Sequence, residues 1–254
     1  MKKMITILAV AMLLWGASAS ADTLDFLKPF WMQMMDGVSN TASGKIPENV
    51  AVTCADERLT VEACGVLLEN DYSAEAHVYA VLKNTGSERL PIRSVQMTVL
   101  GANGNALHQE NYVSYMPSVV EPGETMLVSE WMYDFVKEIG KVHSIQISVE
   151  TASRVNEKWK QLGDVRAWLD GDYLCVEFTN TTEKTLFGVI CAATVSDANG
   201  QILDMMMQSP YDTDDLGIAQ GSSIVWRKRL EDAATLKIGT DAVCKAWAYQ
   251  MEDL

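Results

Sequence analysis

The chain has 254 residues, of which 34 are acidic and 20 are basic, and its formal net charge is −14 at pH 7. Such an acidic chain is repelled by nucleic acids and by anionic lipid surfaces, which makes both poor candidates as partners. Its length suits two domains, each large enough to hold one hydrophobic core.

The first 21 residues have the three parts of a secretory signal peptide. Residues 1–3 form a short basic region, residues 4–17 an apolar region, and residues 19–21 an A-x-A cleavage site. The apolar region is shorter than the roughly 20 residues that a membrane-spanning helix needs. We therefore expect cleavage before Asp22 and export to the periplasm, the cell surface or the extracellular space, with no transmembrane segment in the mature chain.

Residues 22–45 predict an amphipathic helix. Pro29 lies inside this pattern, so the helix either begins near it or bends there. An isolated helix of this kind gains most of its stability by burying its apolar face. We expect the face to dock on the first domain, on a partner, or on another copy of the chain. Its apolar residues, at helical spacing, are Leu24, Leu27, Trp31, Met34, Met35 and Val38.

The chain also contains an internal repeat with an offset of 96 residues. Residues 78–104 and 174–200 share an apolar run that ends in Asn-Thr, followed at matching spacings by Thr-Val and Ala-Asn-Gly. Solenoid repeats are about 20–50 residues long and need at least three copies. Two copies with this offset therefore predict a duplicated domain, and we assign residues 46–151 to domain 1 and residues 164–254 to domain 2.

Both domains are predicted to be rich in β-strands separated by turns. Asn103-Gly104 is typical of a tight hairpin turn, because both residues tolerate a positive φ. The number and spacing of the strands predict two tandem immunoglobulin-like antiparallel β-sandwiches. The strand-like runs are residues 59–68, 76–82, 95–100, 126–131 and 142–150 in domain 1, and residues 165–169, 173–179, 189–195, 223–226 and 242–249 in domain 2.

Residues 152–163 are predicted to form a helix that connects the two domains. Val155, Trp159 and Leu162 lie at positions i, i+4 and i+7, and Ser153 is a suitable N-cap. We expect a short helix here to hold the domains at a defined angle.

The order of these motifs carries a resemblance to a known family. In domain 1, Asn-Thr-Gly is followed by an apolar strand, Asn-Gly and Pro-Gly-Glu-Thr, and domain 2 repeats most of this order. The pattern resembles the FxLYD-type domain of bacterial exported proteins and the neighbouring immunoglobulin-like envelope modules. The Phe-x-Leu-Tyr-Asp core itself is absent from residues 97–101 and 193–197. The resemblance implies a binding or unknown function and carries over no catalytic residue.

Export permits disulfides among the five cysteines, but their odd number leaves at least one thiol unpaired. Cys54 and Cys64 could close a small loop, and Cys175 and Cys191 could join two strands of domain 2. Cys244 could be a buried free thiol. Connectivity cannot be deduced from sequence alone, so these alternatives stay open.

Residues suited to catalysis or metal binding are sparse. His77, His108 and His143 are far apart in the sequence, and no metal, nucleotide or nucleophile motif is present. The acidic residues 211–217 offer oxygens to Ca²⁺ but lack a complete set of ligands, which favours a solvated loop. Residues 205–207, all methionine, fit a half-buried strand better than a contact surface.

We therefore predict an exported, non-enzymatic binding protein of the cell envelope or extracellular space, with no catalytic, cofactor-binding or metal-binding residues. Its partner would be a protein or a glycan. One alternative is a structural envelope subunit that self-associates through residues 22–45, and a weaker alternative is a secreted hydrolase whose site has no sequence motif.

Overall fold

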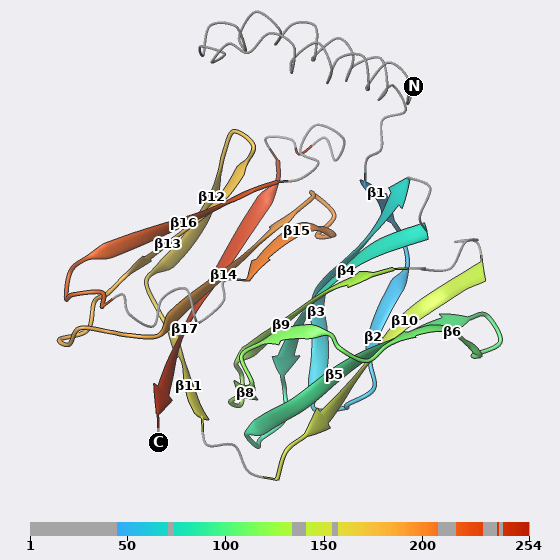
Figure 1. Cartoon of the computed structure of the whole chain (residues 1–254), viewed down its shortest axis with the longest axis horizontal. Helices are drawn as coiled ribbons and strands as arrows, with labels where there is room; N and C mark the ends of the chain where they lie inside the picture. Colours follow the sequence, from blue (N-terminus) through green and yellow to red (C-terminus); the bar gives the residue numbers. More distant parts are fainter. Residues whose placement is uncertain are drawn as a thin grey trace, which may run out of the picture. The chain divides into compact units, whose positions relative to one another are not determined.

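The computed structural model describes residues 45–70, 74–133, 141–153, 157–207, 217–230, 238 and 241–253. The seventeen elements named within these residues are all β-strands, from β1 (Lys45–Glu48) to β17 (Val243–Asp253) (Figure 1). No helix in this part of the chain is long and apolar enough to cross a membrane. The predicted signal peptide, and the predicted N-terminal helix up to residue 44, lie outside the described residues.

The first half of the chain forms two sheets of five strands each, and their pairings are antiparallel except for the parallel pair β2–β10. The first sheet has the order β1, β3 (Leu59–Asn70), β4 (Ala74–Asn84), β9 (Thr125–Met132) and β7 (Ser114–Met116). The second has the order β2 (Ala51–Cys54), β10 (Val142–Thr151), β5 (Leu90–Gly101) and β6 (Ala106–Glu110), and β8 (Val119–Val120) pairs with β5.

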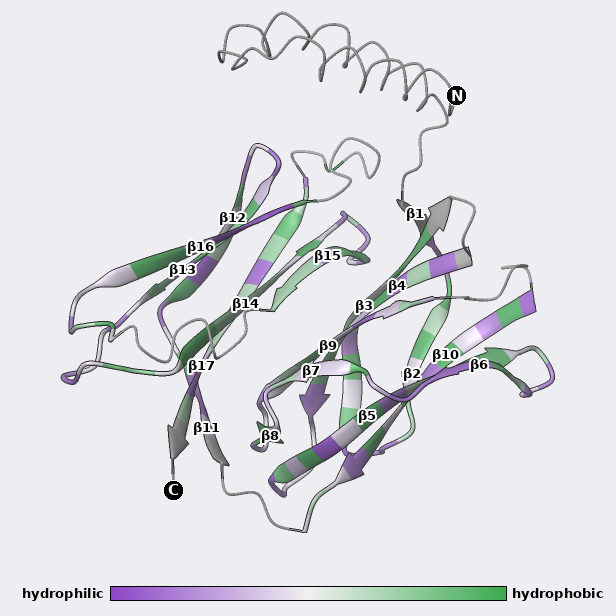
Figure 2. Ribbon diagram, viewed as in Figure 1, coloured by the Kyte–Doolittle hydropathy of each residue, from purple (hydrophilic) through white to green (hydrophobic). Residues whose placement is uncertain are grey.

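These two sheets pack against each other through the apolar side chains of alternating residues. Along β5, buried positions alternate with more exposed ones over most of the strand, and Figure 2 shows this strand banded in purple and green. Successive side chains of a strand point to opposite sides, so one side of β5 is available for the core. Buried residues of both sheets form one hydrophobic cluster, which includes Val66, Val78, Leu82, Met126, Met97, Val99, Ile145 and Ile147.

The second half forms a four-stranded sheet and a three-stranded sheet, both antiparallel. The four-stranded sheet has the order β11 (Glu157–Leu162), β17, β14 (Val189–Ser196) and β15 (Ile202–Met207). The three-stranded sheet has the order β12 (Val165–Asp170), β13 (Tyr173–Thr179) and β16 (Ser223–Arg229). The prediction of a mainly β protein with antiparallel sheets is therefore confirmed.

The helical connector predicted over residues 152–163 is wrong, because Glu157–Leu162 form strand β11. Its partner is β17, in a register that runs from Glu157↔Asp253 to Leu162↔Ala248. Trp159 and Leu162 are both buried, as a helical face would require, but they pack as residues of a strand. A short apolar pattern is ambiguous between helix and strand. The backbone hydrogen bonds offered by β17, which lies far away in the sequence, decide between them.

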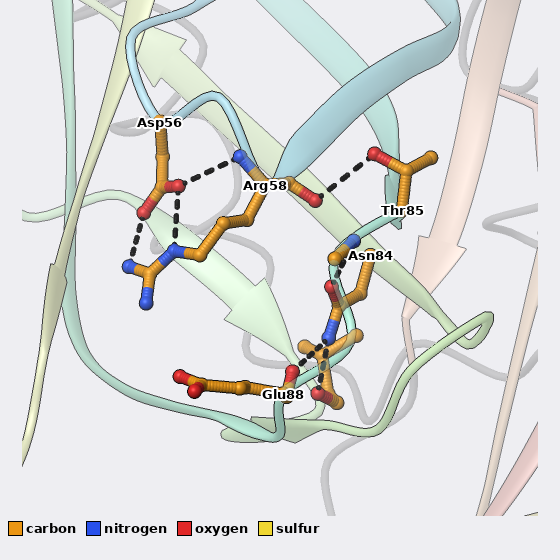
Figure 3. A network of polar contacts seen from close by, with 7 residues as sticks. Asp56, Arg58, Asn84, Thr85 and Glu88 are labelled. Atoms are coloured by element: carbon orange, nitrogen blue, oxygen red, sulfur yellow. Dashed lines mark hydrogen bonds and ion pairs between the residues drawn. The ribbon is translucent and has the colours of Figure 1, made fainter.

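A buried asparagine organises the same turn in both halves. Asn84 is fully buried, and its Nδ2 donates hydrogen bonds to the carbonyl oxygens of Glu88 (2.8 Å) and Val120 (3.0 Å). Its Oδ1 accepts a hydrogen bond from the backbone N–H of Gly86 at 3.0 Å, and Figure 3 shows this network. The side chain therefore satisfies three backbone groups at the end of β4.

Asn180, at the 96-residue offset, makes the matching contacts in the second half. It is also fully buried, and its Nδ2 donates to the carbonyl oxygens of Lys184 (2.8 Å) and Ile218 (2.7 Å). Its Oδ1 accepts a hydrogen bond from the backbone N–H of Thr182 at 2.9 Å. The sequence repeat thus corresponds to a repeated hydrogen-bond network.

A glycine completes each of these turns. The backbone N–H of Gly123 donates to the carbonyl of Asn84, and that of Gly221 donates to the carbonyl of Asn180, both at 2.8 Å. The two glycines have φ values of 82° and 73°. This left-handed region suits glycine because it has no Cβ. The sequence match between residues 122–123 and residues 220–221 therefore reflects one conserved backbone geometry.

The two halves meet in a shared core. Gly44–Leu254 form one compact unit, and a hydrophobic cluster joins Tyr79, Val81 and Leu127 of the first half to residues of the second. Hydrogen bonds cross the same boundary. The hydroxyl of Tyr249 donates to the carbonyl of Thr125 at 2.8 Å, where both groups are buried.

One glycine allows the backbones of the two halves to approach closely. A Cβ at Gly65 in β3 would lie 1.9 Å from the carbonyl oxygen of Ile202 in β15. That distance is far below van der Waals contact, so only glycine fits at position 65. Beside this contact, the hydroxyl of Tyr79 donates to Oδ1 of Asp204 at 3.3 Å.

Candidate binding surface

The three-stranded sheet β12–β13–β16 presents one side to the core and the other to solvent. Leu174, Val176 and Phe178 of β13 are buried in the core. Because side chains alternate along a strand, Tyr173 and Glu177 of β13 point the other way. Polar and aromatic residues gather on this second side.

Five residues define what we call the arginine–aromatic face: Arg166, Trp168, Tyr173, Arg227 and Arg229. Residues that lie opposite one another in neighbouring antiparallel strands share a side of the sheet. The register pairs Arg166 with Glu177, Trp168 with Cys175, Cys175 with Arg227, and Tyr173 with Arg229. All five side chains therefore project from one side of the sheet.

Two of these arginines lie over aromatic rings. The guanidinium carbon of Arg166 is 5.4 Å from the centre of the Trp168 ring, and that of Arg227 is 4.6 Å from the centre of the Tyr173 ring. Both distances fall within the range of a cation–π interaction, which holds the guanidinium against the ring. The arrangement restricts two long side chains that would otherwise be free to move.

The same two arginines pair with acidic residues of the sheet. An Nη2 atom of Arg227 lies 2.7 Å from Oδ2 of Asp170, and Arg166 contacts the carboxylate of Glu177. The arginine side chains remain 50% and 75% exposed, respectively. Arg229 is also exposed and forms no ion pair with any residue that the structure describes. An ion pair as exposed as Arg227–Asp170 contributes about 0–1 kcal/mol, whereas the Glu177 side chain is 17% exposed and contacts both Nε and Nη2 of Arg166.

The charge of this sheet is opposite to that of the whole protein. Its three strands contain four basic and two acidic residues, a net of +2, whereas the chain carries −14. One of the basic residues, Lys228, points to the core side, where its Nζ lies 2.6 Å from Oδ1 of Asp204. That buried carboxylate also accepts the hydrogen bond from Tyr79, so it links β16 to the shared core.

An apolar pocket of 490 Å³ lies at the edge of β12, where Trp168 lines it together with Ala167 and Leu169, whose side chains alternate with Trp168 and pack against the core. A pocket next to exposed charged groups can take one apolar side chain of a partner while the charges contact its polar groups. The lining includes Ala167, Trp168, Leu169, Ile238, Ala242 and Cys244.

In the first half of the chain, the equivalent side of the sheet is already covered. At the 96-residue offset, Tyr79 and Val81 of β4 correspond to Cys175 and Glu177 of β13. Tyr79 and Val81 are 1% and 2% exposed and pack in the cluster that joins the two halves. The side of β4 that forms the junction is thus the side of β13 that carries Tyr173, Glu177 and the buried Cys175.

The pairing registers extend this equivalence to the neighbouring strands. Opposite Tyr79 stands Gly65, and opposite Cys175 stands Trp168. Opposite Val81 stands Leu127, which is buried in the junction, and opposite Glu177 stands Val225, which is 48% exposed. At two of these positions a small or apolar residue of the junction is therefore replaced by a larger or charged one: Trp168 stands in place of Gly65, and Glu177 in place of Val81.

The three histidines singled out in the sequence do not converge. His77 lies on β4, where its ring stacks on Tyr79 with centroids 4.7 Å apart, while His108 lies on β6 and His143 on β10. Among the described residues, no group of three or more His, Cys, Asp or Glu side chains is arranged to hold a metal ion. Of the acidic segment formed by residues 211–217, only Gly217 belongs to the described part of the chain.

The methionine run and the cysteines have structural positions. Met205 and Met206 are buried in β15, which confirms the interpretation of this run as a strand that packs in the core. All five cysteines are free thiols, so neither of the two bridges considered from the sequence is present. Burial raises the pKa of the Cys54, Cys64 and Cys244 thiols, which lowers the fraction of reactive thiolate at neutral pH.

Sequence reasoning missed the arginine–aromatic face, although the signal was present. Arg166, Trp168 and Asp170 alternate with less polar residues, as expected for the solvent side of a strand. The predicted strand 223–226 ended before Arg227 and Arg229, whereas β16 continues to Arg229. The two arginines were therefore never placed on the same sheet as Trp168.

Comparisons with known proteins identify no family. No family model matches the chain, and no curated protein matches it either. Among solved structures, it is similar to a transglutaminase from red sea bream at 11% sequence identity and a TM-score of 0.19. The match covers 78% of this chain and 29% of the transglutaminase chain, and a likeness this low carries no argument.

Proposed function

We propose that this chain is an exported, non-enzymatic binding protein and that it binds a partner through its arginine–aromatic face. The observation that carries the proposal is the composition of that face, with one tryptophan, one tyrosine and three arginines on one exposed side of a sheet. These are the three residue types that dominate the binding energy of protein–protein interfaces.

The proposed architecture is a pair of immunoglobulin-like domains that act as one rigid unit. Support comes from the repeated asparagine turn and from the pairs of sheets whose buried side chains share cores. The junction contributes the rigidity. Its buried hydrogen bond between Tyr249 and Thr125, together with the close approach at Gly65, leaves little room for relative motion. A rigid support lowers the entropic cost of presenting a binding surface.

Export is proposed from the sequence of residues 1–21, which has the basic, apolar and A-x-A parts of a signal peptide. Self-association through residues 22–45 stays an alternative to partner binding, because an amphipathic helix has to bury its apolar face.

The test is a crosslinking pull-down from the native envelope, with the exported product of the full chain as bait. The variant Tyr173→Ala removes an aromatic side chain from the arginine–aromatic face. The variant Tyr112→Ala is the matched control, since Tyr112 is 90% exposed and lies outside that face. We expect a specific partner to be captured by the wild type and the control and to be lost with Tyr173→Ala. Equal capture by all three proteins would place the binding surface elsewhere, and no capture would contradict the binding function.

A further inference from the structure

Building on the proposed binding function, we infer that the arginine–aromatic face docks a short acidic segment of a partner protein. The carboxylates of that segment take the places that Asp170 and Glu177 occupy in the free protein. An apolar side chain of the segment enters the pocket beside Trp168.

The first support is the relation between the two copies of the repeat. In the first copy, the equivalent side of the sheet binds the second half of the chain through Tyr79, Val81 and Leu127. In the second copy, Glu177 and Val225 stand at the positions of Val81 and Leu127, and Val225 is 48% exposed. The side that serves as an interface in one copy is thus partly exposed in the other, with a charge at the position of Val81.

The second support is charge complementarity. On the solvent side of the sheet, three arginines stand with Asp170 and Glu177, a net of +1 on a chain whose total is −14, so the remainder of the chain carries −15. An acidic segment is attracted to this sheet and repelled by the rest of the surface, which sets both the place and the orientation of docking. A neutral segment gains nothing from this contrast.

The size of the face selects a protein segment rather than a long polyanion. Three strands span about 10 Å across, and a seven-residue strand such as β16 extends about 23 Å. One extended segment of six or seven residues fits this area. A nucleic acid would continue beyond it over acidic surface, where it is repelled within the Debye length of about 8 Å at physiological salt.

The arginines are positioned in advance for carboxylates. A guanidinium presents a planar fork of N–H donors that matches a carboxylate, and stacking on an aromatic ring is compatible with this contact. Arg166 and Arg227 are held over Trp168 and Tyr173, so little side-chain entropy is lost on binding. Arg229 has no ion pair among the described residues and can accept a carboxylate without displacing another.

The binding test uses a fluorescently labelled eight-residue peptide in which glutamates alternate with neutral residues and one leucine is included. Its matched control replaces each glutamate by glutamine. With the exported product of the full chain, we expect the glutamate peptide to bind at least tenfold more tightly in 50 mM salt, and its affinity to fall as salt is raised. Equal binding of the two peptides overturns the inference.

Two sets of variants give predictions of opposite sign. The double variant Arg227→Gln with Arg229→Gln should weaken binding of the glutamate peptide at least tenfold, whereas Asp170→Asn with Glu177→Gln should strengthen it several-fold. The control Arg93→Gln removes another exposed arginine, from β5, and should change the affinity less than twofold. If the arginine variant binds as the wild type does, or if the carboxylate variant binds more weakly, the inference is wrong.

The outcomes also separate this inference from the proposed function. If a native partner is captured through Tyr173 while the arginine variants retain it, the binding function stands and the acidic-segment inference falls. If the mass of the protein in solution rises with concentration and Arg229→Gln abolishes the rise, the occupant is a second copy of the chain, and the inference is likewise overturned.

Discussion

Replacing Asn180 by alanine should destabilise the protein strongly, because this one buried side chain makes four hydrogen bonds. The amide donates to the carbonyls of Lys184 and Ile218 and accepts from the backbone N–H and the hydroxyl of Thr182. A typical hydrogen bond contributes about 1 kcal/mol net, and a stranded buried group costs about 1–3 kcal/mol. The carbonyl of Ile218 also accepts a hydrogen bond from the backbone N–H of Leu186 at 3.0 Å, so it keeps one partner when the amide is removed. Lys184 and Thr182 are accessible to replacement by water.

Four lost hydrogen bonds at about 1 kcal/mol each give an expected loss of about 4 kcal/mol in the free energy of unfolding. Urea denaturation measures it directly, through the midpoint and the slope m. The neighbouring exposed variant Thr181→Ala is the control. It removes one hydrogen bond to Asp164 and should cost about 1 kcal/mol or less.

Asn180→Asp offers a sharper test of the same reasoning. Aspartate keeps the shape of asparagine but replaces the two donors by an oxygen that faces two carbonyl oxygens, so it should destabilise more than alanine at pH 7. Protonation of this carboxyl at low pH should relieve part of the loss. A loss below 1 kcal/mol for Asn180→Ala with an unchanged m, or a harmless Asn180→Asp, would refute this account of the turn.

Three further predictions concern the junction between the halves. Gly65→Ala places a Cβ against the carbonyl of Ile202, so overpacking should cost about 1–3 kcal/mol or more, seen as a lower Tm; an unchanged Tm would contradict the contact. Tyr249→Phe strands the carbonyl of Thr125 and should lower the free energy of unfolding by about 1–3 kcal/mol, measured in urea; no loss would show that the carbonyl finds another donor. Burial raises the pKa of the Glu124 carboxyl, so the folded state binds this proton more tightly than the unfolded state, and the stability falls as the pH rises above 4.5. Glu124→Gln should reduce this fall between pH 4.5 and pH 7. An identical pH dependence of the urea midpoint in the variant and the wild type would count against this prediction.

Several elements could be predicted from local sequence because local sequence determines them. The run 173–179 coincides with β13, and the runs 165–169 and 189–195 lie within one residue of β12 and β14. These segments are apolar or β-branched and are bounded by turn residues, so propensity and burial agree. The repeated Asn-Thr signature likewise marked a turn whose geometry is local to a few residues.

Other elements depend on partners that local sequence cannot show. β11 satisfies its backbone by pairing with β17, about ninety residues later, and its short apolar pattern fits a helix equally well. The full length of β16 follows from its pairing with β13, where Arg229 stands opposite Tyr173. The run predicted from the sequence, 223–226, ends at Trp226, whereas β16 continues to Arg229. Without Arg227 and Arg229, the sequence does not predict the arginine–aromatic face.

One pair of positions links the repeat to the proposed function. Gly65 in β3 and Trp168 in β12 stand opposite equivalent residues of the two central strands, Tyr79 and Cys175. At position 65 the missing side chain lets the backbone of Ile202 approach, and the two halves join. At position 168 the large side chain of Trp168 prevents such a close approach of another backbone, and its ring instead contacts the guanidinium of Arg166. A close backbone approach at this position is therefore possible in the first copy, whereas the same position of the second copy presents a large side chain to a partner. A binding surface of that kind depends on the charges and rings that it presents, and for this reason single substitutions of Tyr173, Arg227 and Arg229 are expected to reveal it.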